Sequence, residues 1–116
     1  MNNDKVMKPG VVLNGNSNNT IRHSVVFRFN EGMNELEKQQ FFYAVTKLTA
    51  INGVEKFEIL KQVSIKNKFE YGISMEFKNE EGYQYYNNHP DHVAFVQNIW
   101  LRNVEDFLEI DYKALD

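Results

Sequence analysis

Apolar and polar residues alternate along residues 20–29, and this period of two predicts a half-buried strand. One side of the strand is apolar except for a histidine; its members are Ile21, His23, Val25, Phe27 and Phe29. The other side is polar except for Val26. Turn-forming residues at 30–32 end the strand. We therefore expect the apolar side to face the core.

The spacing of apolar residues changes to that of a helix over residues 33–50. Asn34 can cap this helix, and Glu37 stands three residues later, as a capping box requires. The apolar stripe comprises Leu36, Phe41, Ala44, Val45 and Leu48. Asn52 and Gly53 close the segment. The chain thus predicts a strand followed by an amphipathic helix.

Two further segments, 54–64 and 69–77, alternate in the same way and flank a polar turn at 66–68. The apolar positions of the second segment are Phe69, Tyr71, Ile73, Met75 and Phe77. Because only a short turn separates the two segments, we expect them to pair as a hairpin.

A short helix at 79–88, a longer helix that begins at Pro90 and a strand at 104–112 complete the pattern. His89 takes the capping position before Pro90. The apolar positions on one side of the last strand are Leu108, Ile110 and Tyr112. The order of elements predicts an α+β domain of the ferredoxin-like βαββαβ type, with helices over one face of a four-stranded antiparallel sheet.

The first 19 residues differ from the rest of the chain. They contain six Asn residues, and Pro9, Gly10 and Gly15 interrupt them. Such a segment cannot bury enough apolar surface to offset the entropy lost on ordering it. We expect a flexible, Asn-rich tail over 1–19 and a single domain over 20–116.

A net charge of −3 and the lack of cysteine narrow the possible functions. Disulfides, thiolate metal sites and a cysteine nucleophile are excluded. Basic residues do not cluster as phosphate binding requires, so no nucleic-acid partner is predicted. No apolar run approaches the roughly 20 residues of a membrane span, and the N-terminus lacks the apolar core of a signal peptide. We therefore expect a cytoplasmic protein without a membrane partner.

Two histidines should point into the layer between the sheet and the helices. His23 lies on the apolar side of the first strand, and His92 lies on the apolar stripe of the last helix. Tyr86, at the end of the preceding helix, can add a hydroxyl to the same layer. A neutral imidazole can accept a proton and a phenol can donate a hydrogen bond to a carbonyl oxygen, so these three residues are the candidate catalytic groups. The residues expected to line a small-molecule site beside them are Phe27, Tyr71, Phe95 and Val96.

Simpler interpretations of these residues stay open. Each histidine can instead be a structural residue that bonds to the backbone. A metal site built from His23, His89 and His92 lacks a standard ligand spacing, so neither a metal nor another cofactor is predicted. Charged residues should occupy the opposite face of the sheet, either in solvent or against a second subunit. They are Arg22, Arg28, Glu70, Glu76, Glu109 and Asp111.

Several motifs match a known family. They are Arg22-His23 in the first strand, Phe27-Arg28-Phe29 at its end, Ile51-Asn52-Gly53-Val54 before the second strand, Ile110-Asp111-Tyr112 in the last strand and, most specific, the block from Tyr86 to His92 with the pattern Tyr-x-x-His-Pro-x-His. Over roughly residues 20–113 the chain resembles the stress-responsive dimeric α/β-barrel family, known as Dabb.

The resemblance implies a homodimer in which two sheets face each other to form a barrel with the helices outside. It also implies acid–base roles for His23 and His92, with Tyr86 assisting, as in a plant polyketide cyclase of the family. Three functions are then open for this chain. The first is a stress-response protein that binds a small, partly apolar molecule. The second is a cofactor-independent lyase or cyclase acting on a β-keto or aromatic compound, and the third is a haem-dependent monooxygenase.

Overall fold

The computed structural model describes residues 6–8, 11–12 and 19–115. Strands β1 (Val6–Lys8) and β2 (Val11–Val12) pair antiparallel. The rest of the tail predicted over 1–19 lies outside the described residues.

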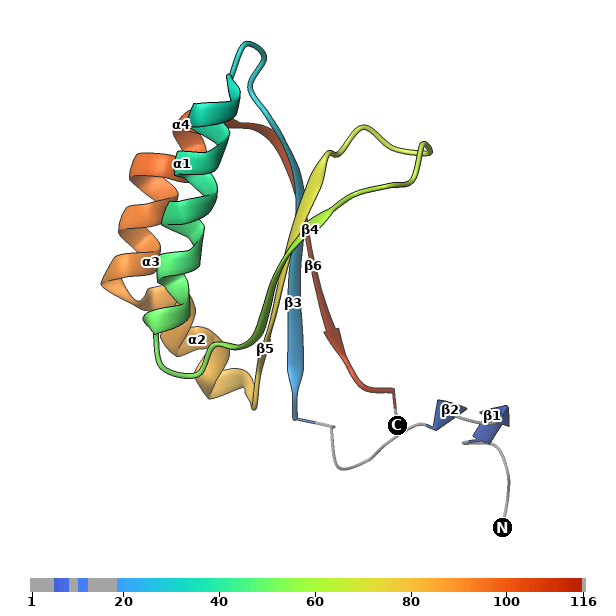
Figure 1. Cartoon of the computed structure of the whole chain (residues 1–116). Coiled ribbons are helices and arrows are strands. Elements are labelled where there is room, and N and C mark those ends of the chain that lie inside the picture. The colour runs from blue at the N-terminus through green and yellow to red at the C-terminus, as the bar shows by residue number, and fades with distance from the viewer. Residues whose placement is uncertain (1–5, 9–10, 13–18, 116) are drawn as a thin grey trace.

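Four strands form the main sheet, in the order β4-β5-β3-β6, and each neighbouring pair is antiparallel. They are β3 (Ile21–Phe29), β4 (Glu55–Lys61), β5 (Tyr71–Phe77) and β6 (Val104–Lys113). All the helices lie against one face of this sheet, and the other face is open (Figure 1). The predicted ferredoxin-like α+β fold is confirmed, including the hairpin of β4 and β5.

Polar side chains begin each main helix, as the sequence predicts. Helix α1 (Glu35–Thr46) starts in a capping box: Asn34 Oδ1 accepts from the Glu37 amide at 2.8 Å, and Glu37 Oε1 accepts from the Asn34 amide at 3.0 Å. A 3-10 turn, η2 (Lys47–Ala50), extends it. Asn79 caps α2 (Glu80–Asn88), and His89 caps α3 (Pro90–Phe95) through Nδ1, which accepts from the Asp91 amide at 3.0 Å.

The last helix is longer and less regular than expected. After α3 the chain forms a π-helical turn, η3 (Val96–Trp100), and ends in α4 (Leu101–Asn103). The side-chain amide of Asn103, through Nδ2, donates to the Ile99 carbonyl at 2.8 Å and so engages the widened turn. Turns of this kind occur often beside functional sites, and η3 lies beside the site described below.

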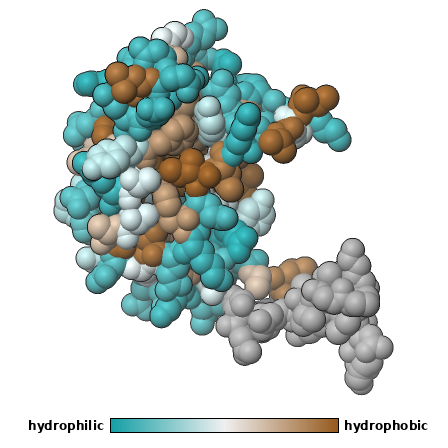
Figure 2. Space-filling model, in the orientation of Figure 1, coloured by the Kyte–Doolittle hydropathy of each residue, from teal (hydrophilic) through white to brown (hydrophobic). Residues whose placement is uncertain are grey.

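Strand β4 is shorter than the predicted segment 54–64, since it ends at Lys61. Gln62 then bonds to the chain before β5. The Gln62 amide nitrogen of the main chain donates to the Glu70 carbonyl at 2.9 Å, and its side chain donates to the Phe69 carbonyl at 2.6 Å. The residues between form a loop that projects away from the helices (Figure 1). Two apolar side chains on this loop, Val63 and Ile65, are largely exposed. Figure 2 shows hydrophobic atoms projecting from the molecule on the side of this loop.

Aromatic residues fill one end of the layer between the sheet and the helices. Phe27 is 0% exposed, and its ring centroid lies 5.0 Å from that of Trp100 and 5.6 Å from that of Phe41. We call this cluster the aromatic end; its members are Phe27, Phe29, Phe41, Phe42, Tyr71 and Trp100. Rings at these separations and tilts interact favourably beyond the area that they bury.

The uncovered side of the sheet, here called the open face, carries an apolar row across all four strands. Val26 stands opposite Gly72 on β5 and Leu108 on β6, and Gly72 stands opposite Leu60 on β4. Ile110 and Tyr112 continue the row along β6 and are exposed. Charged pairs flank it, of which Arg22 with Glu76 is one.

One prediction about the open face is wrong. Glu109 and Asp111 were expected there, but β6 pairs with β3 so that Asp111 stands opposite His23 and Glu109 opposite Val25. Opposed residues of an antiparallel pair share one face of the sheet. Both carboxylates therefore lie on the side that the helices cover, and the apolar residues Leu108 and Ile110 lie on the open face.

None of the helices in the described part of the chain is both long enough and apolar enough to cross a membrane.

Candidate functional site

Strand β3 places His23 at the opposite end of the layer from the aromatic end. The side chain is buried, with 7% of the residue exposed. Its Nδ1 lies 2.7 Å from Asp111 Oδ1. A carboxylate only accepts hydrogen bonds, so Nδ1 carries the proton, and in the neutral ring Nε2 keeps a free lone pair. Asp111 thus fixes the tautomer and the orientation of the imidazole.

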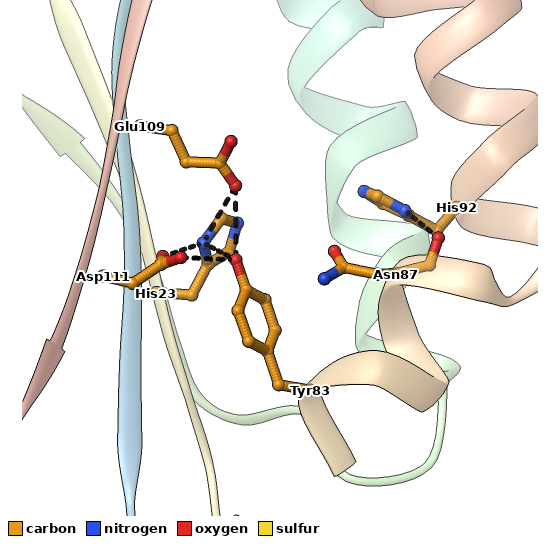
Figure 3. A network of polar contacts seen from close by, with 6 residues as sticks. All are labelled: His23, Tyr83, Asn87, His92, Glu109 and Asp111. Carbon is orange, nitrogen blue, oxygen red and sulfur yellow. Dashed lines mark hydrogen bonds and ion pairs between the residues drawn. The ribbon is translucent and has the colours of Figure 1, made fainter. Parts of the chain in front are cut away.

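Helix α2 adds a tyrosine that the sequence analysis did not assign to the site. The Tyr83 hydroxyl donates to Asp111 Oδ2 at 2.8 Å and lies 3.2 Å from Glu109 Oε2 and 3.0 Å from His23 Nδ1 (Figure 3). Burial and the neighbouring carboxylates raise the pKa of Tyr83 well above its ordinary value, so it stays a hydroxyl donor. Tyr83 stands three residues before Tyr86 and so shares its helix face, which is the signal that could have found it.

His92 faces this group from helix α3. Its Nδ1 lies 3.1 Å from the Asn87 carbonyl, which can only accept, so Nδ1 carries the proton here too. Figure 3 shows the other ring nitrogen, Nε2, directed toward His23 and Glu109 across the space between helices and sheet. Burial lowers the pKa of His92, which favours a neutral ring with a lone pair on Nε2.

Tyr86, on helix α2, lines the same space beside the two imidazoles. Its ring centroid lies 4.3 Å from that of His92 and 6.2 Å from that of His23. The residue is 2% exposed, and burial raises the pKa of its hydroxyl. Because the hydroxyl forms no hydrogen bond with another described residue, it is available to a ligand as a neutral donor.

A cavity of about 210 Å³ lies between these groups. His23, Tyr86, His92 and Glu109 contribute its polar lining, and the rest of the lining is apolar: Val25, Val45, Leu48, Ile73, Met75, Phe95, Val96, Trp100, Leu101 and Phe107. Figure 2 shows apolar side chains reaching the surface between the helix layer and the sheet. The volume is below the roughly 300–1,000 Å³ of sites for drug-sized ligands, so the cavity suits about one ring or a short branched chain.

Four residues were predicted to line the ligand site, and the structure divides them. Phe95 and Val96 line the cavity. Phe27 and Tyr71 do not, because their rings pack against each other and against the other members of the aromatic end. The candidate catalytic residues His23, His92 and Tyr86 all come together at the cavity. We call His23, Tyr83, Tyr86, His92, Glu109 and Asp111 the polar end of the layer.

The described residues contain one further grouping, of metal-ligand type. One ligand atom each from His23, Glu109 and Asp111 lies within 4.8 Å of the others. The histidine set weighed from the sequence is not the one assembled, since His89 caps α3. In the structure both carboxylate oxygens of Asp111 already accept hydrogen bonds, one from the His23 ring and one from the Tyr83 hydroxyl.

Comparison with known proteins assigns the family. The sequence profile of the Stress responsive A/B Barrel Domain, Dabb, matches residues 21–114. The chain belongs to the Dabb family. A crystal structure of a Dabb protein from Mesorhizobium loti is 47% identical in sequence, with a TM-score of 0.81, and the match covers 84% of this chain and 99% of that one.

More distant solved structures share the fold. A dimeric ferredoxin-like protein of unknown function from Thermobifida fusca is 24% identical, with a TM-score of 0.71 over 84% of this chain and 92% of that one. The hydroxynitrile lyase of Passiflora edulis is 12% identical, with a TM-score of 0.76 over 85% of this chain and 96% of that one. The search of curated proteins found no match.

Proposed function

We propose that this Dabb protein binds a small, partly apolar molecule in the cavity between its sheet and its helices. One observation carries the proposal: the cavity combines an apolar lining with two polar atoms that no described residue engages, the Tyr86 hydroxyl oxygen and His92 Nε2. Ligand sites typically combine an apolar wall with a few polar groups that fix orientation. A carbonyl or hydroxyl on the ligand would meet the Tyr86 hydroxyl and His92 Nε2.

A cavity-filling substitution tests this proposal. Val96→Phe adds a ring to the lining and leaves every polar group in place. Val93→Phe is the matched control, because Val93 is exposed on the same helix and is not in the lining. Uncharged single-ring compounds such as benzyl alcohol and acetophenone would be titrated by NMR. We expect binding to wild type and to Val93→Phe and its loss in Val96→Phe; equal binding by all three proteins would refute the site.

A second function, proton transfer beside a carbonyl group, is supported by the direction of His92. Its Nε2 lone pair points toward His23 and Glu109, the ring of Tyr86 lies beside the His92 ring, and the His23–Asp111 pair lies across from it. A base and a neutral hydroxyl donor at one carbonyl are what a lyase or cyclase needs to form and stabilise an enolate.

Deuterium exchange tests this second function without knowledge of the natural substrate. The methyl protons of acetophenone in heavy water would be followed by NMR with and without protein. Exchange faster than the buffer rate, lost in His92→Asn, is the expected result for a proton-transferring site. Binding without any acceleration would leave the protein a binder only. The haem alternative gains no support, because the cavity has the size of a single ring.

The open face supports a homodimer. An exposed apolar row flanked by charged pairs, as on this face of the sheet, is typical of a surface that another protein covers. We propose that a second copy of this chain covers it, sheet against sheet. Light scattering at micromolar concentration should give twice the chain mass. Ile110→Asp should shift it to the monomer, whereas Leu36→Asp, on the exposed side of α1, should not.

A further inference from the structure

The hydrogen-bond count at the polar end leaves one carboxylate with spare accepting capacity. Two protein groups donate there, Tyr83 through its hydroxyl and His23 through Nδ1. Asp111 receives both of them, at 2.8 and 2.7 Å. Glu109 receives only their longer contacts, with Oε2 at 3.2 Å from the tyrosine oxygen and 3.5 Å from the imidazole nitrogen. Glu109 therefore has no donor of its own among the described residues.

No cationic side chain of the described residues neutralises this pair of carboxylates. Arg22 pairs with Glu76, Arg28 with Glu105 and Lys68 with Asp106. The cavity lining contains neither Arg nor Lys, and Glu109 is part of it. The cavity thus has a negative wall at one end.

The remaining polar groups of the lining fit the same kind of ligand. His92 presents Nε2 as an acceptor, and the aromatic ring of Tyr86 lies beside it. Acceptors and aromatic faces both attract an ammonium group. A carboxylate placed there would meet Glu109 at close range and would lose its hydration without gaining a cation in return.

We propose that the cavity selects a compact, apolar primary amine, bound as its ammonium form against Glu109, and rejects a carboxylate of the same size. The inference rests on the proposed small-molecule site and adds the charge class of the ligand. Glu109 is then the residue that determines specificity, through direct contact with the ligand. An uncharged isostere fits the same volume and can donate to Glu109, but it lacks the attraction between two opposite charges.

Three ligands that share one ring test the charge class: benzylamine, benzyl alcohol and benzoate, titrated by NMR at low ionic strength. Benzylamine should bind about tenfold more tightly than benzyl alcohol, the effect of roughly one screened charge-assisted hydrogen bond. Benzoate should bind more weakly than both. Added salt should weaken binding of the amine and leave binding of the alcohol unchanged.

Variants locate the effect at one side chain. Glu109→Gln keeps the size of the side chain and removes its charge, so it should lower the affinity for benzylamine about fivefold to tenfold and lower that for benzyl alcohol by a smaller factor. Glu31→Gln, at an exposed turn residue, is the matched control and should change neither affinity.

Each other outcome has a definite meaning. If benzyl alcohol or benzoate binds as tightly as the amine, the cavity is a ligand site but the charge class is wrong. If none of the three binds, the proposed small-molecule site itself fails. If Mn²⁺ alone binds, broadens the signals of residues around His23 and prevents amine binding, the carboxylates serve a metal and the amine proposal is overturned.

Discussion

One face of strand β3 contributes to both ends of the layer between sheet and helices, yet the two ends differ in polarity and in packing. Phe27 and His23 both point toward the helices from β3, and their Cα atoms lie roughly 13 Å apart along the extended strand. Around Phe27 the packing is aromatic and closed to solvent. Around His23 a cavity of about 210 Å³ remains, lined in part by groups with unused hydrogen-bonding capacity.

The difference indicates that the two ends of this small core have different roles. Close packing at the aromatic end supplies apolar burial and a fixed position for β3. A cavity and unpaired acceptors each lower the free energy of unfolding. The polar end can contain both because the aromatic end holds β3 in position. We therefore expect substitutions at the aromatic end to reduce stability and substitutions at the polar end to change binding and titration.

The largest effect should come from the centre of the aromatic end. Phe27→Ala removes a ring with no exposed surface and leaves a cavity among its neighbours. Loss of a fully buried Phe costs about 3–5 kcal/mol of unfolding free energy. Urea denaturation followed by circular dichroism measures it. For a domain of this size that loss could approach the whole of its stability.

The control for Phe27→Ala is Tyr43→Ala, which truncates an exposed ring on α1. Its effect should stay within about 0.5 kcal/mol, as for most surface sites. A loss at Phe27 no larger than that at Tyr43 would mean that the aromatic end does not stabilise the strand, and the division proposed above would fail.

A smaller effect is expected from one hydroxyl at the polar end. Tyr83→Phe keeps the ring and removes the donor that lies 2.8 Å from Asp111 Oδ2. Water can reach Asp111, so the expected loss is about 1 kcal/mol, that of an ordinary hydrogen bond. Tyr85→Phe, on the exposed side of the same helix, is the matched control.

The Tyr83 variant also sharpens the comparison of the two ends. In Tyr83→Phe, Asp111 accepts a hydrogen bond from His23 alone. We expect the His23 imidazole to rotate more freely as a result. We expect the ring signals of His23, followed by NMR, to broaden in Tyr83→Phe because the imidazole is less firmly held, and to be unaltered in Tyr85→Phe. Unchanged ring signals in both would show that Tyr83 only fills space.

The sequence was sufficient for the fold and for one half of the site. Alternation at Ile21–Phe29 and at Tyr71–Phe77, helical spacing after Asn34 and the cap at His89 each fix an element through local geometry. The same periodicity placed His23 and His92 on faces that meet, because which way a side chain points depends only on the period.

The other half of the site depends on tertiary structure. In β6 the alternation favours the more apolar set, with Leu108 and Ile110, as the covered side of the strand. The register with β3 decides otherwise, since it sets Asp111 opposite His23. The apolar set lies on the open face, where a sheet-to-sheet dimer would bury it. Pairing register is not encoded in the pattern of one strand.

Side-chain packing explains the remaining differences. Whether Phe27 or Phe95 lines a cavity depends on how neighbouring rings fill space, and periodicity places both on covered faces without distinguishing them. The spacing from Tyr86 places Tyr83 on the same helix face, but nothing in the sequence reveals the carboxylate that it meets. Its partner, Asp111, comes from a strand 28 residues away.

The smallest predicted effect concerns the pH dependence of stability at His92. Burial lowers the pKa of this imidazole below its ordinary 6.5 in the folded protein. Between the folded and unfolded values the unfolded chain binds more protons, so the unfolding free energy rises with pH in that range. The contribution is therefore complete above pH 6.5 and is lost as the pH falls below it toward the folded value.

His92→Asn removes this titration and keeps a donor for the Asn87 carbonyl. Urea denaturation from about pH 7.5 to about pH 5 should show a steeper loss of stability on acidification in wild type than in the variant. Val93→Ala, a change of the neighbouring residue without charge, should run parallel to wild type. If His92→Asn also runs parallel, His92 titrates as in the unfolded chain. The His92 side chain would then be as hydrated as a surface residue, and the polar end would lack the neutral base on which the proton-transfer function depends.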